Sequence, residues 1–197
     1  MTMTIRNVYL DCEFLRGDLS NSGLVSLALT DDDDRTYYAV NSQMEYGLVM
    51  ADEWMRANVW PILPKTATHA LDREHADVKK LRQIRVEVAE YFRLTDQPVQ
   101  LYAYYGAQDV VRLHGLWDGN WNDMPDEVPR WFFDLKALAV QAGNPELPEQ
   151  AFGAHHPLED ARHNRTMHRF LKAVSHRCVN CDGVRPEKCL YNPERAA

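Results

Sequence analysis

The segment from Val8 to Phe14 constrains the fold most, because its composition is that of a buried strand that carries two carboxylates. Side chains alternate between the faces of a strand, so Asp11 and Glu13 are expected to point to the same side. Two like charges that close repel each other, and burial raises the cost of ionising both. Either the strand end is solvated, or the negative charge of the pair is compensated by a divalent cation, a basic partner or a shared proton.

The composition places the chain among soluble globular proteins. Its 197 residues, 45% hydrophobic and 26% charged, suffice for one domain with a sizeable core. The net charge of -7 argues against broad, sequence-independent binding of nucleic acid. This net charge is still compatible with a local basic rim around an acidic cleft. The start of the chain lacks the apolar core of a secretory signal, and no apolar run is long enough to cross a bilayer. We therefore expect a cytoplasmic protein with free thiols rather than disulfides.

The order of the expected elements predicts an α/β fold. Apolar runs at 5–14, 23–30 and 36–40 predict an antiparallel meander, in which the acidic run 31–34 forms a solvated hairpin turn. Further strands are expected at 99–104 and 130–134. Apolar residues at three- and four-residue steps predict a helix with one buried stripe over 72–93. Other helices are expected over 46–58, 107–116, 135–142 and 157–175. A sheet with helices packed on it follows from this order.

Two more acidic residues fall at comparable places in the chain. Asp109 opens the helix after the strand at 99–104, where capping by the helix dipole would also explain an acid. Asp160 lies in the first turn of the last helix, five residues after His155. Two hard divalent cations about 4 Å apart can clamp the attacking and leaving oxygens of a phosphodiester. Four carboxylates suit that clamp, and an imidazole with a pKa of about 6.5 suits a base that activates water.

In their order and spacing, these motifs resemble a known enzyme family. Asp11-x-Glu13, Asp109 and His155-x4-Asp160 are similar to the three motifs of the DEDDh branch of the DnaQ-like 3'-5' exonucleases. Similar stretches over most of residues 8–174 resemble in particular the RNase AS family, small bacterial exoribonucleases directed at polyadenylate. The resemblance implies an RNase H-like fold with a mixed sheet of about five strands flanked by helices. It also implies release of nucleoside monophosphates, one at a time, from the 3' end of single-stranded RNA.

The resemblance also implies roles for the motif residues. Its metal ligands, for two Mg²⁺ or Mn²⁺ ions, would be Asp11, Glu13, Asp109 and Asp160. His155 would be the general base that deprotonates the attacking water. His156 adjoins it and leaves the identity of the base open, although the spacing favours His155 and we expect His156 to face solvent or the loop.

Three residues are candidates for substrate contact. Cys12 lies between the two acids, but strand alternation turns it to the opposite face, where packing is expected. Phe14 could pack against the terminal base or belong to the core. Arg162 is the one residue of the basic face of the last helix expected to contact phosphate, because the rest of that face is interpreted as solvated.

Residues 1–175 are expected to form the exonuclease domain, and residues 176–197 a cysteine-containing tail. Cys178, Cys181 and Cys189 could hold Zn²⁺ or remain free thiols, because one CxxC with one further cysteine does not specify a site. The expected partner is single-stranded nucleic acid, with RNA favoured over DNA, and no membrane; the resemblance further implies a homodimer. The alternatives are a DNA exonuclease of the same fold and a catalytically silent nucleic-acid-binding module.

Overall fold

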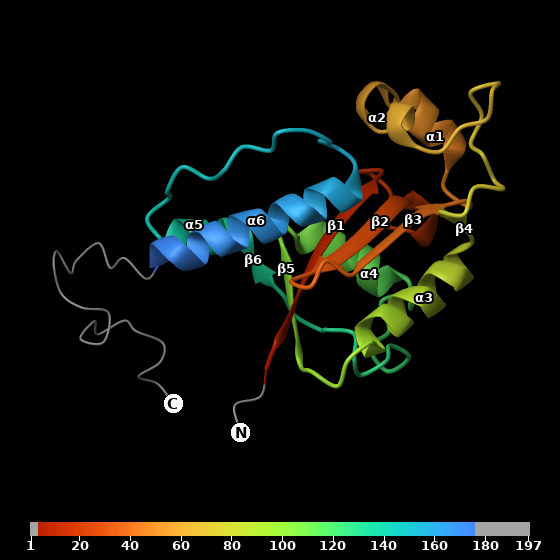
Figure 1. Cartoon of the computed structure of the whole chain (residues 1–197). Coiled ribbons are helices and arrows are strands. Elements are labelled where there is room, and N and C mark those ends of the chain that lie inside the picture. The colour runs from red at the N-terminus through yellow and green to blue at the C-terminus, as the bar shows by residue number, and fades with distance from the viewer. Residues whose placement is uncertain (1–3, 176–197) are drawn as a thin grey trace, which may run out of the picture.

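The computed structural model describes residues 4–175, whose strands join in one mixed sheet of order β4-β3-β2-β1-β5-β6 (Figure 1). The first three strands form the predicted antiparallel meander, whereas β4, β5 and β6 run parallel to their neighbours. The strands are β1 (Arg6–Phe14), β2 (Leu24–Asp31), β3 (Thr36–Asn41), β4 (Val78–Lys79), β5 (Val99–Ala103) and β6 (Phe133–Asp134). The mixed α/β sheet predicted from the sequence is thus confirmed, with six strands rather than about five.

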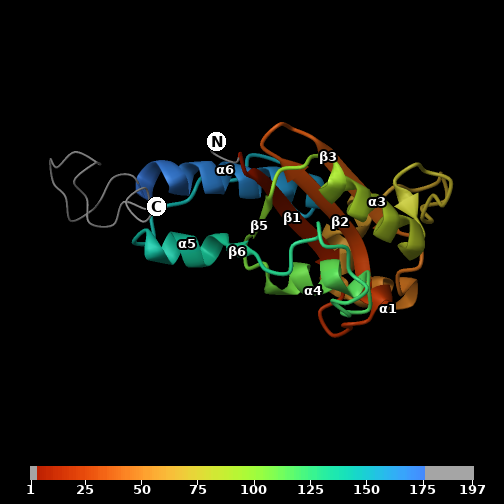
Figure 2. The ribbon, with the colours of Figure 1, turned by 90° about the horizontal axis from the view of Figure 1, so that it is seen from below.

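Helices cover both faces of the sheet, as Figure 2 shows for α6 and α4 on opposite sides of β1. Val8 and Leu10 of β1 pack with residues of α3 and α4, while Tyr9 points to the other face and packs with α5 and α6. Strand alternation therefore builds two cores from one strand. No helix in the described range is long and apolar enough to span a membrane. The helices are α1 (Tyr46–Ala51), α2 (Glu53–Asn58), α3 (Leu81–Arg93), α4 (Ala107–Gly115), α5 (Leu135–Gln141) and α6 (Pro157–Ser175).

A lobe formed by α1 and α2 replaces the single helix predicted over 46–58. Asp52 between them has an extended backbone, and its side chain accepts a hydrogen bond of 2.9 Å from the Met55 backbone N–H. An aspartate that caps a new helix in this way competes with continuation of the previous one. Met55 is buried in an apolar cluster that includes Val25 and Val40 of the sheet, so α2 is anchored to β2 and β3.

The strand β4 interrupts the helix predicted over 72–93. The Val40 N–H donates to the Asp77 carbonyl at 2.7 Å, and the Ser42 N–H donates to the Lys79 carbonyl at 2.8 Å. The edge of β3 would otherwise leave backbone groups unpaired, and this pairing outweighs the local helical pattern. The helix therefore begins at Leu81. At the other edge of the sheet, pairing shortens the strand predicted over 130–134 to Phe133–Asp134.

A buried ion pair ties the start of β1 to the end of β2. The fully buried carboxylate of Asp31 accepts hydrogen bonds from Arg6 Nε at 2.8 Å and Arg35 Nε at 2.6 Å. Two backbone N–H groups, of Asp33 and Arg35, also donate to it. Burial opposes ionisation of Asp31, but the hydrogen bonds from Arg35 and Arg6 outweigh it and lower the pKa of this carboxyl. The acidic turn is thus present as predicted, yet its first member is part of the core.

We expect Asp31→Ala to lower the free energy of unfolding at neutral pH by about 3–5 kcal/mol, because it leaves a buried arginine without its counter-charge. Urea denaturation measures this loss. The wild-type advantage is present above the pKa of the unfolded state, about 3.9, and disappears as the pH falls through the lowered pKa of the folded state. The exposed acid Asp33 is the matched control, and equal losses in Asp33→Ala and Asp31→Ala would contradict the assignment.

Candidate active site

The candidate site lies where β1 extends beyond the part that pairs with β5. The two strands pair only from Arg6 to Tyr9 of β1, so the backbone of β1 beyond this point needs other partners. The Cys12 N–H donates to the Asp109 carboxylate at 2.9 Å, and the Asn164 side chain donates to the Leu10 carbonyl at 2.9 Å. Side chains of α4 and α6 therefore take the place of β5 along the last part of β1.

The start of α4 is held close to the sheet. A β-carbon on Gly106 would lie 2.3 Å from the Ala103 β-carbon, so only glycine fits this approach. The Gly106 N–H donates at 3.0 Å to Asp134, whose other carboxylate oxygen accepts the Lys136 N–H and caps α5. This geometry sets Asp109, three residues later, at the end of β1. Its carboxylate accepts the Cys12 N–H of β1, so a role at the start of its own helix is not its whole function.

Asp160 is oriented by the loop that precedes α6. One carboxylate oxygen accepts the His155 N–H at 2.9 Å, and the other accepts the Gln150 side-chain amide at 2.6 Å. His155 has φ of 69°, in the left-handed region that costs a residue with a β-carbon about 1–3 kcal/mol. The hydrogen bond to Asp160 helps to hold this backbone, which turns the imidazole toward the carboxylates.

The end of β1 and the start of α6 bring together three groups that could hold a metal ion. Ligand atoms of Glu13, His155 and Asp160 all lie within 4.8 Å of one another. Burial, followed by the negative charges of Asp160 and Asp109, raises the pKa of Glu13 to about 8. Burial and the charges of Asp109, Asp160 and Glu13 likewise raise the pKa of Asp11. The four predicted acids therefore share one electrostatic environment.

The pKa values of Asp109 and Asp160 are raised as well. Burial raises the pKa of Asp109 to about 7 although the Cys12 N–H favours its charged form, and Asp134 raises it further. Burial also raises the pKa of Asp160, against hydrogen bonds from Gln150 and His155. The carboxylate oxygens of this set are the ligands that Mg²⁺ or Mn²⁺ prefers. Divalent cation binding would relieve the repulsion that these raised pKa values report.

The structure revises the predicted substrate contacts. Cys12 is buried in the core on the face of β1 opposite the carboxylates, the packing expected from strand alternation, and this placement leaves it no room to contact substrate. Phe14 packs against the same core, and the Arg112 guanidinium covers its ring at 4.8 Å from the centroid. Arg162 forms an ion pair with Glu159 on its own helix, which leaves its cation partly neutralised.

His156 is not directed at solvent, contrary to expectation. It is half-buried, and its ring lies 4.7 Å from the Tyr38 ring between centroids. His155 instead lies beside the carboxylates, with its ring edge-on to Trp54 at 4.8 Å. The structure therefore separates two histidines that the sequence left as competitors.

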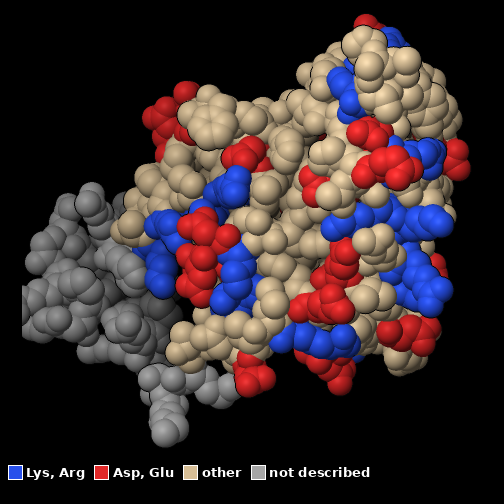
Figure 3. Space-filling view, turned by 45° about the vertical axis from the view of Figure 1, so that its right-hand side comes forward, with Lys and Arg blue, Asp and Glu red and all other residues tan. Residues whose placement is uncertain are grey.

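Two arginines on the basic face of α6 are paired with acidic residues, although Arg169 stays exposed to solvent. Arg165 forms an ion pair of 2.6 Å with Asp34, and Arg169 approaches Asp32 at 3.6 Å. Figure 3 shows acidic and basic side chains interleaved on the visible face of the molecule. The acidic turn thus pairs with Arg165 and Arg169, which makes these two cations less available to a phosphate.

Two residues at the rim of the site were not predicted. Trp54 on α2 and Arg16 after β1 are both exposed, and the Arg16 guanidinium lies 5.3 Å from the centroid of a Trp54 ring. Arg16 is also close enough to lower the pKa of Glu13. No spacing in the sequence links positions 16, 54 and 155, so only the folded chain reveals this cluster.

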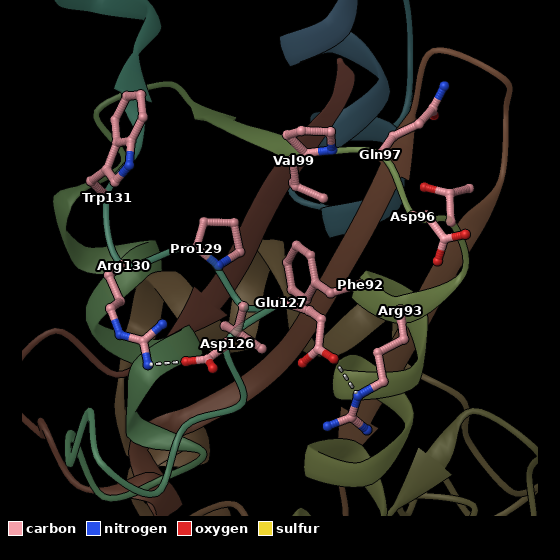
Figure 4. Close-up of a pocket in the computed structure, with 13 residues that line it drawn as sticks. Phe92, Arg93, Asp96, Gln97, Val99, Asp126, Glu127, Pro129, Arg130 and Trp131 are labelled. Atoms are coloured by element: carbon pink, nitrogen blue, oxygen red, sulfur yellow. Dashed lines mark hydrogen bonds and ion pairs between the residues drawn. The ribbon is translucent and has the colours of Figure 1, made fainter. Parts of the chain in front are cut away.

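A cavity of about 760 Å³ lies elsewhere, between the end of α3 and the loop before β6 (Figure 4). Its rim arginines are already paired, Arg93 with Glu127 and Arg130 with Asp126. None of the predicted site residues lines it. The cysteines predicted as a zinc site, 178, 181 and 189, fall outside the described residues.

We predict that Asp109→Asn stabilises the metal-free protein, because it removes one of the repelling charges while its amide oxygen still accepts the Cys12 N–H. In EDTA the Tm should rise by about 2–4 °C, the shift that about 1 kcal/mol produces in a chain of this size. Millimolar magnesium should raise the Tm of the wild type but not that of the variant. Thermal melts followed by circular dichroism test this, with the exposed Asp96→Asn as control. An equal magnesium response in Asp109→Asn and wild type would remove Asp109 from the metal site.

Comparisons with known proteins agree with this geometry. No protein-family model matches the chain. Proteins of two Mycobacterium tuberculosis strains, CDC 1551 and H37Rv, both named 3'-5' exoribonuclease, are 32% identical to it over 168 residues, which cover 84% of this chain and 93% of each relative.

The solved structure of exonuclease I is similar with a TM-score of 0.51 at 13% identity, over 88% of this chain and 44% of that one. The chain thus spans less than half of exonuclease I, and the likeness confirms the RNase H-like fold alone. The identity to the mycobacterial proteins, over nearly their whole length, carries the assignment further. The chain belongs to the family of 3'-5' exonucleases that includes these mycobacterial proteins.

Proposed function

We propose that the protein is a divalent-metal-dependent 3'-5' exoribonuclease of the DEDDh type, which releases nucleoside monophosphates from single-stranded RNA. The convergence of Glu13, His155 and Asp160, with ligand atoms within 4.8 Å of one another, is the observation that carries this proposal. The two mycobacterial relatives are named exoribonucleases, which favours RNA over DNA as the substrate.

The residues fit the expected cofactor. The proposed ligands of two Mg²⁺ or Mn²⁺ ions are Asp11, Glu13, Asp109 and Asp160. Their raised pKa values indicate that positive groups in the described part of the protein do not fully compensate the negative charge of these carboxylates. Bound divalent cations would polarise the phosphodiester and lower the pKa of the attacking water.

His155 is the proposed general base. It accepts a proton from the attacking water, whose oxygen forms a bond to phosphorus as the bond to the 3' oxygen of the preceding nucleotide breaks. That oxygen takes up a proton from solvent, so the products are a nucleoside 5'-monophosphate and a shortened strand with a 3' hydroxyl. The hydrogen bond from the His155 backbone to Asp160 keeps the ring next to the proposed ligands.

Other parts of the proposal extend the resemblance. They are a preference for polyadenylate, a homodimer, a cytoplasmic location and an exonuclease domain of residues 1–175. The exoribonuclease names of the two relatives support a protein that works on RNA.

We expect magnesium-dependent shortening from the 3' end of a 5'-labelled single-stranded oligo-A RNA, with no shortening of the matched oligo-A DNA and none of either in EDTA. Denaturing gels over a time course measure this, and an oligo-U RNA tests the base preference. Equal shortening of DNA would identify a general exonuclease of the same fold. Hydrolysis that survives EDTA would contradict the metal site. A folded protein that cleaves neither strand would be a binding module.

His155→Asn should lower kcat on oligo-A RNA by about 100- to 10,000-fold, the usual contribution of a general base. Asparagine tolerates the left-handed backbone at this position, so the loss reports on the imidazole and not on the loop. His156→Ala is the matched control; it removes the ring that packs on Tyr38 and should lower the Tm while kcat stays within a few-fold. The assignment of the base fails if turnover is lost in His156→Ala and kept in His155→Asn.

A further inference from the structure

The cavity between the end of α3 and the loop before β6 borders an open edge of the sheet. Val99 of β5 and Trp131 both line it (Figure 4). The Arg6 N–H donates to the Pro98 carbonyl at 2.9 Å, and the backbone groups of successive residues point to opposite edges of a strand. The N–H and C=O of Val99 therefore point away from β1. Among the described strands, β6 alone adjoins β5 on that side and pairs with it only from Tyr102 onwards, so Val99 has no strand partner there.

The cavity combines an apolar floor with an exposed aromatic ring. Phe92 and Val128 of the floor are 1% and 0% exposed and belong to the apolar core under β1, which holds them in place. Trp131 is 60% exposed, and its ring meets the Phe133 ring edge-on with centroids 4.9 Å apart. A volume of about 760 Å³ is in the range of ligand-binding cavities. The surface of the cavity therefore suits a ligand that is partly apolar.

The rim of the cavity is acidic. Its carboxylates are those of Asp96, Asp126 and Glu127, against the two guanidinium groups of Arg93 and Arg130. Both guanidinium groups are already paired, with Glu127 and with Asp126, whereas Asp96 has no ion pair among the described residues. One negative charge is thus in excess. This excess favours a cationic ligand and opposes the phosphates of RNA.

We propose that this cavity is a docking site for a basic, extended segment of a partner protein. The segment adds a strand beside the first part of β5 and pairs its main chain with Val99, the way in which peptides bind at a free sheet edge. Its apolar side chains occupy the floor, and an arginine or lysine lies over Trp131 and pairs with Asp96. The cavity shares no residue with the candidate active site, so the proposal does not depend on the nuclease function.

An octapeptide of alternating valine and arginine, labelled with fluorescein, is the probe for the full-length protein. Its Kd is measured by anisotropy at about 150 mM salt, where distant surface charges are screened. Trp131→Ala should raise this Kd about 5- to 30-fold, the equivalent of about 1–2 kcal/mol, because the contact between a cation and the ring is lost. Trp121→Ala removes another exposed tryptophan and is the matched control. Equal affinity of Trp131→Ala and the wild type would refute the site.

A charge reversal tests the role of Asp96. Asp96→Lys should weaken binding of the valine–arginine peptide by about 10-fold or more and should strengthen binding of the corresponding valine–glutamate peptide. Asp33→Lys makes the same change in net charge on the exposed turn after β2 and is the matched control. If both variants lose affinity by the same factor, the peptide follows the net charge of the protein rather than the cavity, and the proposal fails.

Hydrogen exchange followed by NMR tests the main-chain pairing. The Val99 amide should exchange about 10-fold or more slowly in the complex with the valine–arginine peptide, because its N–H then donates to the added strand. An unchanged exchange rate at saturating peptide would refute strand addition.

RNA and a second copy of the chain are the alternative occupants. The Kd of a labelled oligo-A RNA in EDTA should be the same for Trp131→Ala and the wild type; a weaker complex of the variant would make the cavity an RNA contact and overturn the proposal. Light scattering should give both proteins the same mass. A dimer that Trp131→Ala dissociates would make a second copy the occupant and would also overturn it.

Discussion

Four carboxylates gathered at the end of β1 and the starts of α4 and α6, two of them buried and two half-buried, are the constraint that organises this protein. Their burial raises the pKa of every one, so folding works against electrostatic repulsion at this point. The opposing interactions are visible: backbone N–H groups of Cys12 and His155 donate to two of the acids. The parting of β5 from β1 supplies the space, and α4 and α6 supply the groups that clamp the open strand. Without a ligand, protonation relieves part of this repulsion, and the proposed divalent cations would balance the charge of the ionised carboxylates.

The contrast with Asp31 shows that the protein can neutralise a buried acid when it needs to. Asp31 lies between Arg6 and Arg35, and its pKa falls although it is fully buried. Glu13 is buried to a similar degree, but the nearest cation that lowers its pKa, Arg16, lies at the exposed rim, and the pKa rises. The first acid belongs to the stability of the meander. The second belongs to the candidate site, where an internal counter-charge would compete with the proposed metal ions.

Sequence patterns predicted the elements well where local and tertiary preferences agree. The alternation along β1 and the stripe of Ile84, Val88 and Tyr91 correspond to buried faces in the structure. The errors occurred where a single hydrogen-bonding need overrode the local pattern. Asp52 capped a second helix, and the unpaired edge of β3 drew Val78 into a strand. Capping and edge pairing depend on which backbone groups remain free, and a periodicity does not contain that information.

The sequence by itself determined the order and chemistry of the site: two acids on one strand face, one acid at each of two helix starts, and a histidine five residues before the last acid. Order along the chain and strand alternation suffice for that, because both are local. Only the tertiary structure decided which histidine faces the carboxylates, that Arg165 and Arg169 of α6 pair with the acidic turn, and that Trp54 and Arg16 lie at the rim. Those outcomes depend on contacts between residues far apart in the chain, and such contacts arise from packing of whole elements.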